Sequence, residues 1–515
     1  MSWQKDLDEL AHRKELAARL GGPEKVERHK KAGKLTVRER IAALTDSDSF
    51  TEIGSVAGFT QYDAEGRLTS YMASNMIMGR AKVDGRPVVV VGDDFTIRGG
   101  ANDGAVTEKL LYAEKMAHDL MLPMIRLVDG TGGGGSVKNI ETKGHSLLPL
   151  MRDWQFVAQN LARVPVVGLA LGSVAGKGAA RVAASHYSVM VKGISQLFNA
   201  GPPVVARIGQ KLEKEELGGS HIHTRNGVVD DEVATEEEAF ARARRFLSYL
   251  PKSVDELPPR VECTDPVERT EEFLLDAIPQ DGRKVYKIRP ILDAIFDQGS
   301  VFEMGRHWGK GVVTAFARVN GYPVAVLASD PYFYGGAWDR ATTEKFTRFV
   351  DLAELFHLPV VNFVDIAGFQ IGLDAEKSGV MRAGVKALSA IYQTTIPWCS
   401  LIIRKAYGVA AAGHQHQGRF GFRYAWPSGN WGSLPIQGGI EAAYKAEIEA
   451  SADPAAKTRE IEERLEKLMS PIRSADTFMI EEIIDPRQTR RYLGEFVELA
   501  QPLLKTGRTH FAYRP

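Results

Sequence analysis

An internal repeat limits the fold of this chain more than any other feature of its sequence. Arg86-Pro87-Val88 opens an apolar run in the first half, and Tyr322-Pro323-Val324 opens a similar run 236 residues later. The same offset relates further pairs: Asp94 and Asp330, Gly99-Gly100 and Gly335-Gly336, Thr107-Glu108-Lys109 and Thr343-Glu344-Lys345, and Leu122-Pro123 and Leu358-Pro359. A constant offset through so many residue types indicates two copies of one structural unit.

Each copy has the element order of an α/β unit. An apolar strand leads to a Gly-Gly loop, a helix and a short buried strand, which ends at Asp129 in the first half and at Asp365 in the second. This order predicts repeated βαβ units. After a small deletion, the strands that begin beyond Val164-Pro165 and Ile396-Pro397 are related by an offset of 232.

At this second offset, two strand-to-helix turns of small residues correspond. Gly176-Lys177-Gly178 matches Gly408-Val409-Ala410. Such a turn leaves unpaired N–H groups that point at one spot, and this arrangement can stabilise an oxyanion. A single glycine turn is more often a plain structural feature, but matched placement in both halves favours a function. Two such turns suit a reaction that develops an enolate on one partner and an anionic carbonyl on the other.

Composition narrows the functional classes. With 515 residues the chain exceeds one hydrophobic core, so at least two domains are expected. The 65 Lys and Arg balance the 65 Asp and Glu, which argues against binding to nucleic acid or to an anionic membrane. Cys263 and Cys399 lack metal-ligand spacing, and a reducing cytoplasm suits so few cysteines. No run approaches the length of a membrane span, and the charged N-terminus predicts an amphipathic helix, not a signal peptide.

Other segments predict structure without chemistry. Roughly residues 250 to 285 are rich in proline and charge, which suits a linker, and the chain beyond residue 440 has a helical pattern. The glycine run at 129–136 lacks the Gly-Lys-Ser/Thr ending of a phosphate-binding loop.

Several longer motifs resemble the acyl-CoA carboxylase beta subunits, the group of propionyl-CoA and methylcrotonyl-CoA carboxylases. In the first half they are GGPEKVERHKKAGKLTVRERIAAL at 21–44, QLFNAGPPVV at 196–205 and EELGGSHIHTRNGVVDDE at 215–232. In the second half they are FTRFVDLAELFHLPVVNFVDIAGF, SGVMRAGVKAL, TIPWCSLIIRKAYG and YAWPSG. The resemblance covers nearly the whole chain.

This resemblance implies a fold and an assembly. The fold is an α/β tandem of two crotonase-like domains, each a β-β-α superhelix, here expected at residues 1–258 and 259–515. Family members form hexamers, trimers of dimers, in which one domain holds acyl-CoA and the partner subunit's other domain holds biotin. Biotin would be carried on a separate biotin carboxyl carrier and charged by a biotin carboxylase, because this chain has no biotinylation site and no ATP-grasp signature.

The resemblance also implies a reaction and its site. Carboxyl transfer would run from carboxybiotin to the α carbon, or the vinylogous γ carbon, of an acyl-CoA, without a side-chain base or a metal. Gly176, Lys177 and Gly178 would hold the thioester oxygen of the enolate, and Val409 and Ala410 the ureido oxygen of biotin. The residues expected to contact the substrates are Gly132, Gly133, Ala179, Gly408, Ala411 and Ala412.

The sequence departs from the family at these turns. Lys177 interrupts the usual consecutive glycines, and its side chain must point elsewhere, for example toward the phosphates of CoA. Val409 replaces a glycine, and a β-branched residue disfavours a positive φ. Ala411 and Ala412 stand where the family often has an aromatic and an acidic residue, which predicts an altered acyl pocket. The alternative functions are therefore an acyl-CoA decarboxylase and a non-catalytic scaffold subunit of a carboxylase complex.

Two histidine pairs lie in loops. An i, i+2 pair such as His414 and His416 could form part of a metal site, but no third ligand is evident, so we expect a polar, partly exposed loop. A histidine that titrates near an acyl group remains an alternative. His221 and His223 lie in a family-like segment and are expected to be structural.

Overall fold

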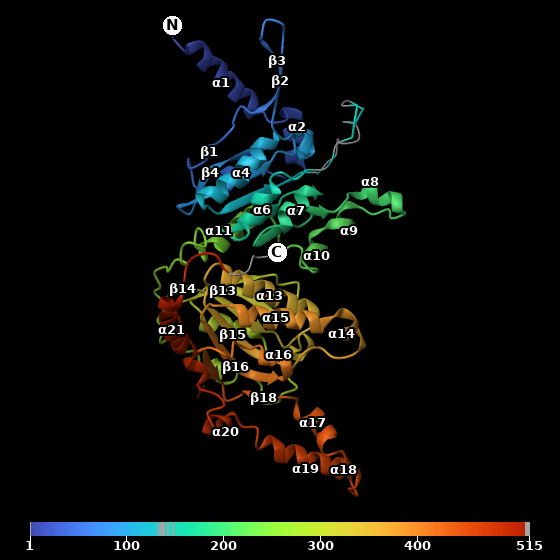
Figure 1. The fold of residues 1–515 in the computed structure, drawn as a ribbon, viewed down its shortest axis with the longest axis vertical. Coiled ribbons are helices and arrows are strands. Elements are labelled where there is room, and N and C mark those ends of the chain that lie inside the picture. The colour runs from blue at the N-terminus through green and yellow to red at the C-terminus, as the bar shows by residue number, and fades with distance from the viewer. Residues whose placement is uncertain are drawn as a thin grey trace. The chain divides into compact units, whose positions relative to one another are not determined.

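A computed structural model describes residues 2–130, 132, 140–141, 144–146, 148 and 150–509 (Figure 1). These residues form two compact units. The first runs to Glu256 and includes the segment that begins at Gly507, and the second is Leu257–Thr506. The first unit is therefore formed from two separate stretches of the chain.

The first unit is built on a seven-stranded sheet with the order β1-β4-β5-β6-β7-β9-β11. The strands are β1 Thr51–Glu52, β4 Met76–Val83, β5 Arg86–Asp93, β6 Met124–Val128, β7 Val166–Ala170, β9 Tyr187–Val191 and β11 Asp231–Val233. Two short pairs accompany it: β2 Gly58–Tyr62 with β3 Leu68–Ala73, and β8 Ser173–Ala175 with β10 Gln196–Phe198. The helices are α1 Gln4–Ala18, α2 Pro23–Lys31, α3 Val37–Leu44, α4 Thr107–Leu120, α6 Trp154–Asn160, α7 Lys177–Ala183, α8 Pro202–Val205, α9 Lys214–Gly218, α10 Ser220–His223 and α11 Glu236–Ser248.

The second unit has an eight-stranded sheet in which β12-β13-β14-β15-β16-β17-β19 follow one another and β18 pairs with β16. The strands are β12 Phe302–Met304, β13 Val312–Val319, β14 Tyr322–Ser329, β15 Val360–Ile366, β16 Trp398–Tyr407, β17 Phe422–Ala425, β18 Asn430–Gly432 and β19 Glu482–Ile483. The helices are α12 Ile288–Ile295, α13 Arg340–Leu355, α14 Leu373–Ser378, α15 Val380–Gln393, α16 Gly408–Ala412, α17 Ile436–Ala443, α18 Lys445–Glu449, α19 Pro454–Glu466, α20 Pro471–Asp476 and α21 Thr489–Ala500.

The repeat extends to the strand register. Val89 of β5 pairs with Met124 of β6, and Ala325 of β14 pairs with Val360 of β15, each member shifted by 236 positions. Each of these strand pairs is parallel and follows an antiparallel hairpin, β4-β5 or β13-β14. The predicted β-β-α order is therefore present in both units.

The two hairpin turns use the residues that tight hairpins require. Asp84 and Gly85 connect β4 to β5, while Asn320 and Gly321 connect β13 to β14. All four have positive φ, between 50° and 78°. Two consecutive positive φ values match the twist of the flanking strands, and Asp-Gly and Asn-Gly adopt them at low cost. The turns thus fix the register from which each half is built.

The core of the second unit lies against one face of its sheet. Apolar side chains of α12 and α21, such as Ile291, Leu292 and Val497, belong to one buried cluster with Val361 and Leu401 of the central strands. Helices α13 and α15 pack on each other, as Figure 1 shows. Each fully buried leucine or valine contributes about 1.5 to 3 kcal/mol to folding. Burial of both sheet faces explains why β13 and β15 are apolar throughout and do not alternate.

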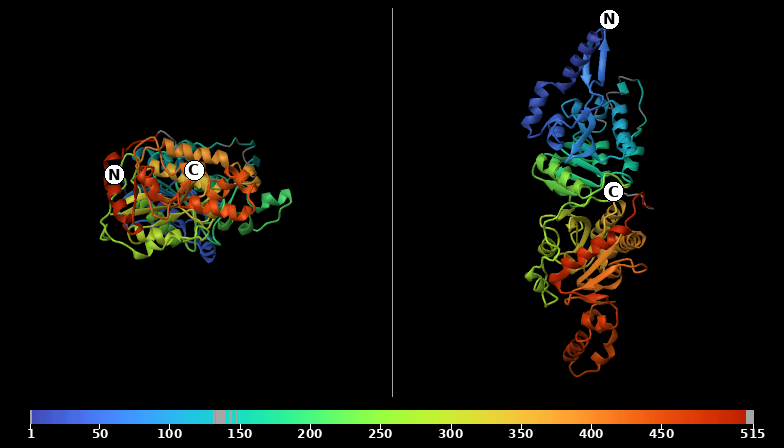
Figure 2. Two further views of the ribbon diagram at one scale, coloured as in Figure 1. Left: turned by 90° about the horizontal axis from the view of Figure 1, so that it is seen from below. Right: turned by 90° about the vertical axis from the view of Figure 1, so that its left-hand side faces the viewer.

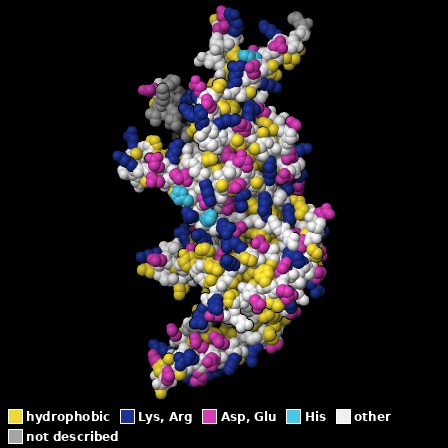
Figure 3. Space-filling view, turned by 180° about the vertical axis from the view of Figure 1, so that it is seen from behind, with side chains coloured by type: hydrophobic (Ala, Val, Ile, Leu, Met, Phe, Trp, Pro, Cys, Tyr) yellow, Lys and Arg dark blue, Asp and Glu magenta, His cyan; other side chains and the backbone are white. Residues whose placement is uncertain are grey.

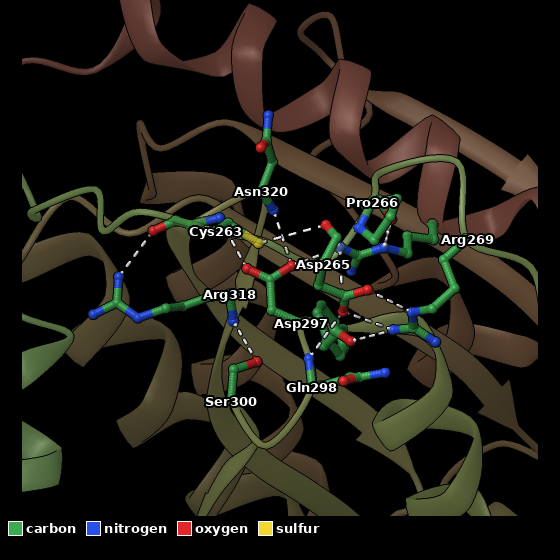
Figure 4. Close-up of polar contacts among 12 residues, drawn as sticks. Cys263, Asp265, Pro266, Arg269, Asp297, Gln298, Ser300, Arg318 and Asn320 are labelled. Carbon is green, nitrogen blue, oxygen red and sulfur yellow. Dashed lines mark hydrogen bonds and ion pairs between the residues drawn. The ribbon is translucent and has the colours of Figure 1, made fainter.

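The proline-rich segment after Glu256 is not a free linker. A polar network attaches it to the second unit (Figure 4). Arg269 binds the carboxylate of Asp265 at 2.7 Å, and the buried Arg490 of α21 binds Asp297 at 2.9 Å and the carbonyl of Asp265 at 2.9 Å. Leu274 is buried in the core of the same unit. The composition of the segment therefore reflects an irregular but packed stretch of chain.

The helical tail predicted beyond residue 440 is present as α17 to α20, which project from the sheet of the second unit (Figure 2). The chain then returns to the sheet through β19 and α21. The predicted N-terminal helix is α1. No helix among the described residues is long and apolar enough to span a membrane. Basic and acidic side chains are intermixed on the face shown in Figure 3.

Candidate functional site

The first predicted turn connects β8 to α7. Gly176 precedes the helix with φ 57° and ψ −120°, a conformation that favours glycine. Its N–H donates to the carbonyl of Phe198 at 3.1 Å, and its carbonyl accepts from Ala180 at 3.0 Å. The backbone N–H groups of Lys177 and Gly178 have no acceptor among the described residues. Gly176 therefore shapes the turn, while the next two residues present the free amides.

Close packing explains why position 178 in this turn is a glycine. A Cβ on Gly178 would lie 2.9 Å from Cγ1 of Val174 and 3.0 Å from the carbonyl oxygen of Gly130. Gly132 lies next to the turn, since a Cβ there would be 3.2 Å from the carbonyl oxygen of Ala175 and 3.5 Å from the nitrogen of Lys177. Ala179 is buried in α7. Gly133 lies outside the described residues.

The Lys177 side chain is held within the first unit. Its Nζ lies 2.6 Å from Oδ1 of Asp153, the residue before α6, and the two side chains are 17% and 4% exposed. This ion pair takes the ammonium group away from the free amides of the turn. The lysine can thus supply an N–H at this position without placing its charge beside them.

Buried ion pairs lie at the ends of β5 and β6, and sequence reasoning missed them. Asp129, at the end of β6, accepts from Lys34 and Arg40 at 2.8 Å each, and Arg40 also binds Glu236 of α11. Burial lowers the pKa of Lys34 against the opposing effect of Asp129. Arg181 of α7 pairs with Asp93 at the end of β5. The 21–44 motif therefore contributes the cations that neutralise the strand-terminal aspartate.

The second predicted turn connects β16 to α16. Gly408 has φ 66° and corresponds to Gly176, so the positive φ falls on a glycine. Val409 is not among the residues with positive φ, and its side chain is 59% exposed. The strain that its β-branched side chain suggested is therefore absent. The N–H groups of Val409 and Ala410 have no acceptor among the described residues, as at Lys177 and Gly178.

A cavity of about 210 Å³ adjoins this second turn. Gly408, Ala411 and Ala412 line one side of it. The remaining lining residues come from β16, the turn after α16, β17, β18 and the segment before β19: Ile402, Ala406, His414, Arg423, Trp431, Gly432, Met479 and Ile480. The small side chains at 411 and 412 thus border open space.

The members of the two histidine pairs lie in different surroundings. The segment around His414 is partly exposed, as expected, since Gln417 and Gly418 are exposed, but His414 itself is buried, and its Nδ1 lies 2.8 Å from the carbonyl oxygen of Ala411. His416 packs against the ring of Tyr392 and accepts from the N–H of Gly418. His223 binds the carbonyl of Leu197, whereas His221 is exposed. Among the described residues, no group of three or more His, Cys, Asp and Glu is placed to hold a metal ion.

Comparison with known proteins identifies the family. The model of the carboxyl transferase domain matches residues 28–508. The carboxyltransferase subunit of propionyl-CoA carboxylase from Haloferax mediterranei is 32% identical over 96% of this chain and 95% of its own length. The mitochondrial propionyl-CoA carboxylase beta chain of Homo sapiens is 30% identical over 94% and 88%. The chain belongs to the carboxyl transferase domain family, the biotin-dependent carboxyltransferases.

Solved structures agree with this assignment. Transcarboxylase 12S, described as a hexamer with methylmalonyl-coenzyme A bound, has a TM-score of 0.88 and 27% identity, covering 100% of this chain and 98% of that chain. A single-chain, multi-domain long-chain acyl-CoA carboxylase has a TM-score of 0.79 and 25% identity, covering 95% and 48%. The predicted family and the predicted tandem of crotonase-like units are confirmed.

Proposed function

We propose that this chain moves a carboxyl group from carboxybiotin to the α carbon, or the vinylogous γ carbon, of an acyl-CoA. One observation carries the proposal: each unit has an equivalent turn in which a positive-φ glycine precedes two free backbone amides. Carboxybiotin, presented by a partner carrier protein, would supply CO2 and leave a basic ureido nitrogen.

The amides of Lys177 and Gly178 would hold the thioester oxygen while the α carbon loses its proton. The amides of Val409 and Ala410 would hold the ureido oxygen of biotin. Donors fixed in advance at sites where negative charge develops lower the barrier without reorganisation. Because the ureido nitrogen accepts the α proton, this scheme needs no side-chain base. Gly132, Gly133, Ala179, Gly408, Ala411 and Ala412 would contact the two substrates.

The proposal includes an assembly. The hexamer named for transcarboxylase 12S supports a hexamer here. The hexamer would be a trimer of dimers. Acyl-CoA would bind the domain of residues 1–258, and biotin would bind the domain of residues 259–515 of a partner subunit. A biotin carboxylase and a biotin carboxyl carrier would complete the reaction, in the cytoplasm. The metal-free scheme assigns no role to either cysteine.

Transfer of labelled bicarbonate tests the proposed function. The purified chain is combined with biotin carboxylase, biotinylated carrier, ATP and a panel of short, branched and long acyl-CoAs. We expect acid-stable label in at least one acyl-CoA, and no label when the chain is omitted. Absence of label across the panel, with the protein folded and hexameric, would contradict the proposal and favour a scaffold subunit. Release of CO2 from a malonyl-type CoA without biotin would instead indicate a decarboxylase.

A further inference from the structure

Strand β16 reaches the second turn through a bulge. The neighbours of Asp365 in β15 pair with Ile402 and with Ala406 of β16, so Asp365 lies opposite three residues, 403–405. Regular pairing resumes at Ala406, only two residues before Gly408. A bulge interrupts the hydrogen-bond ladder and redirects the strand that contains it. The direction in which the chain enters the turn therefore depends on how this bulge is held.

The carboxylate of Asp365 fills the bulge. Its Oδ1 accepts from the backbone N–H of Lys405 at 3.1 Å, and its Oδ2 accepts from Nε of Arg404 at 3.0 Å. Both acidic and basic side chains of this pair are buried. A buried backbone N–H needs an acceptor, and the bulge takes Lys405 out of the ladder with β15. The carboxylate thus replaces a backbone carbonyl of β15.

Further contacts fix the position of this carboxylate. The hydroxyl of Tyr286 donates to Oδ2 at 2.9 Å, and burial raises the pKa of Tyr286, so the hydroxyl stays protonated. The backbone N–H of Asp365 donates to the hydroxyl of Ser329 at 3.1 Å. Arg404 also donates to the carbonyl of Lys284 at 2.7 Å. All of these residues belong to the second unit.

The strand between the bulge and the turn is paired on both sides. Residues 405–407 pair with β18, and Ala406 also pairs with β15. The hydroxyl of Tyr407 donates to the side chain of Asn430 in β18. A stretch held in this way moves as a unit, so a displacement at Lys405 is passed on to Gly408 and to the free amides of the two residues after it.

The first unit has an equivalent aspartate but no equivalent bulge in this strand pair. At the offset of 236, Asp129 corresponds to Asp365, and at the offset of 232, Gly172 corresponds to Arg404. A Cβ on Gly172 would lie only 2.0 Å from Oδ1 of Asp129. Strands β6 and β7 pair in one register along the whole of β6. A carboxylate beside the chain that leads to the turn is therefore common to both units, whereas its bond within a bulge belongs to the second.

We propose that Asp365 is a positioning residue for carboxyl transfer, and that its bond to the N–H of Lys405 sets the direction of the free amides of Val409 and Ala410. Because Asp365 is fully buried, it acts through the strand and not on a substrate. The inference rests on the proposed function, since it concerns the turn proposed to hold the ureido oxygen of biotin. Loss of the carboxylate should impair this turn and leave acyl-CoA binding by the first unit unchanged.

A second buried aspartate provides a matched control for Asp365→Asn. Asp297 accepts from the backbone N–H groups of Asn320 and Gly321 at 3.0 and 2.8 Å, and from Arg490 at 2.9 Å. It therefore combines two backbone bonds with an arginine, as a buried aspartate of the same unit. It holds the hairpin turn before β14, whereas Asp365 lies near the end of β15, which runs parallel to β14. The two aspartates thus lie at opposite ends of the sheet.

Two measurements on the full-length variants test the inference. A misplacement of about 1 Å can lower a rate by about 100-fold, so Asp365→Asn should lower kcat for transfer of labelled bicarbonate by about that factor. The KM for acyl-CoA should stay the same. Asp297→Asn should keep kcat per folded protein. Hydrogen–deuterium exchange, which needs no activity, should be faster in peptides covering 403–410 for Asp365→Asn and unchanged there for Asp297→Asn.

Several results would overturn the role of Asp365. Equal kcat and equal exchange in the two variants would do so, as would a raised KM for acyl-CoA with kcat retained in Asp365→Asn. If the single variant does not fold, Asp365→Asn/Arg404→Met removes the buried cation that it leaves unpaired. Unchanged kcat and exchange in this double variant would then overturn the role. Absence of transfer by the unmodified protein would contradict the proposed function itself, and exchange at 403–410 would still show whether Asp365 holds the strand.

Discussion

The ammonium nitrogen of Lys177 and a carboxylate oxygen of Asp153 lie 2.6 Å apart, and both side chains are largely buried. Lys177→Met would leave the carboxylate buried without its cation, which should cost about 3 kcal/mol of folding free energy. Chemical denaturation of the variant measures this loss. The double variant Lys177→Met/Asp153→Asn should recover part of it, whereas equal stability of the single and double variants would show that the pair contributes nothing.

Lys177→Gly tests the other role of this residue. The substitution keeps the backbone N–H, so transfer activity per folded protein should change little if only the amide acts. A large rise in KM for acyl-CoA, with kcat retained, would instead show that the ammonium group contributes to substrate binding.

Proline substitution can remove one amide of the second turn. Val409→Pro lacks the N–H and falls in the first turn of α16, where proline is tolerated. We expect kcat to fall by roughly 100-fold to 1000-fold, the typical effect of losing one oxyanion donor. Val409→Ala is the matched control and should retain activity, because it keeps the amide and removes only an exposed side chain. Similar activity of the two variants would contradict the proposed role of this amide.

Gly336 lies close to the backbone of β15, and the neighbouring Gly335 does not, so alanine variants at the two positions test the effect of this close approach. Both have positive φ, but a Cβ on Gly336 would lie 2.3 Å from the carbonyl oxygen of Asp365, whereas Gly335 has open space around it. Gly335→Ala should cost about 1 to 2 kcal/mol from the left-handed conformation alone. Gly336→Ala should cost several kcal/mol more, or prevent folding. Thermal unfolding measures both, and equal losses would show that the backbone moves apart easily.

Lys109 predicts a pH dependence of stability. Burial lowers the pKa of this lysine to about 8, although its Nζ donates to the carbonyls of Gly54 and Met76. Between pH 8 and the unfolded value of 10.5, the unfolded chain holds a proton that the folded chain lacks, so this residue makes stability rise with pH. The gain is roughly 3 kcal/mol at most. Lys109→Met should remove it, and parallel pH profiles of the two proteins in denaturation would refute the shift.

The sequence predicted the architecture well because the repeat consists of short motifs that can be recognised in the sequence without knowledge of the fold. Turn residues such as Gly85 and Gly321 and the strand-terminal aspartates have fixed offsets, and these set the register of both sheets. It also placed the two strand-to-helix turns. Of the three residues predicted at the first turn, Gly176 donates its N–H to Phe198, while Lys177 and Gly178 keep amides without an acceptor among the described residues. What it could not predict were contacts between segments far apart in the chain. Arg40 with Asp129 and Glu236, and Lys177 with Asp153, depend on the folded arrangement.

The position of Val409 illustrates a second limit. A β-branched residue in place of a glycine suggested an altered turn, but the positive φ belongs to Gly408. Similarly, the sequence around His414 suggested a polar, partly exposed loop, and only the fold shows that this histidine is itself buried, with a nitrogen that has no partner among the described residues.

The hydrogen bond from Gly507 to the carbonyl of Val254, at 2.7 Å, joins the two stretches of chain that form the first unit. The segment Leu257–Thr506 is consequently an insertion whose two ends lie side by side. During synthesis the ribosome must translate the whole of Leu257–Thr506 before it translates the segment from Gly507, which belongs to the first unit. The N-terminal unit therefore reaches its final state only after the second unit has been translated.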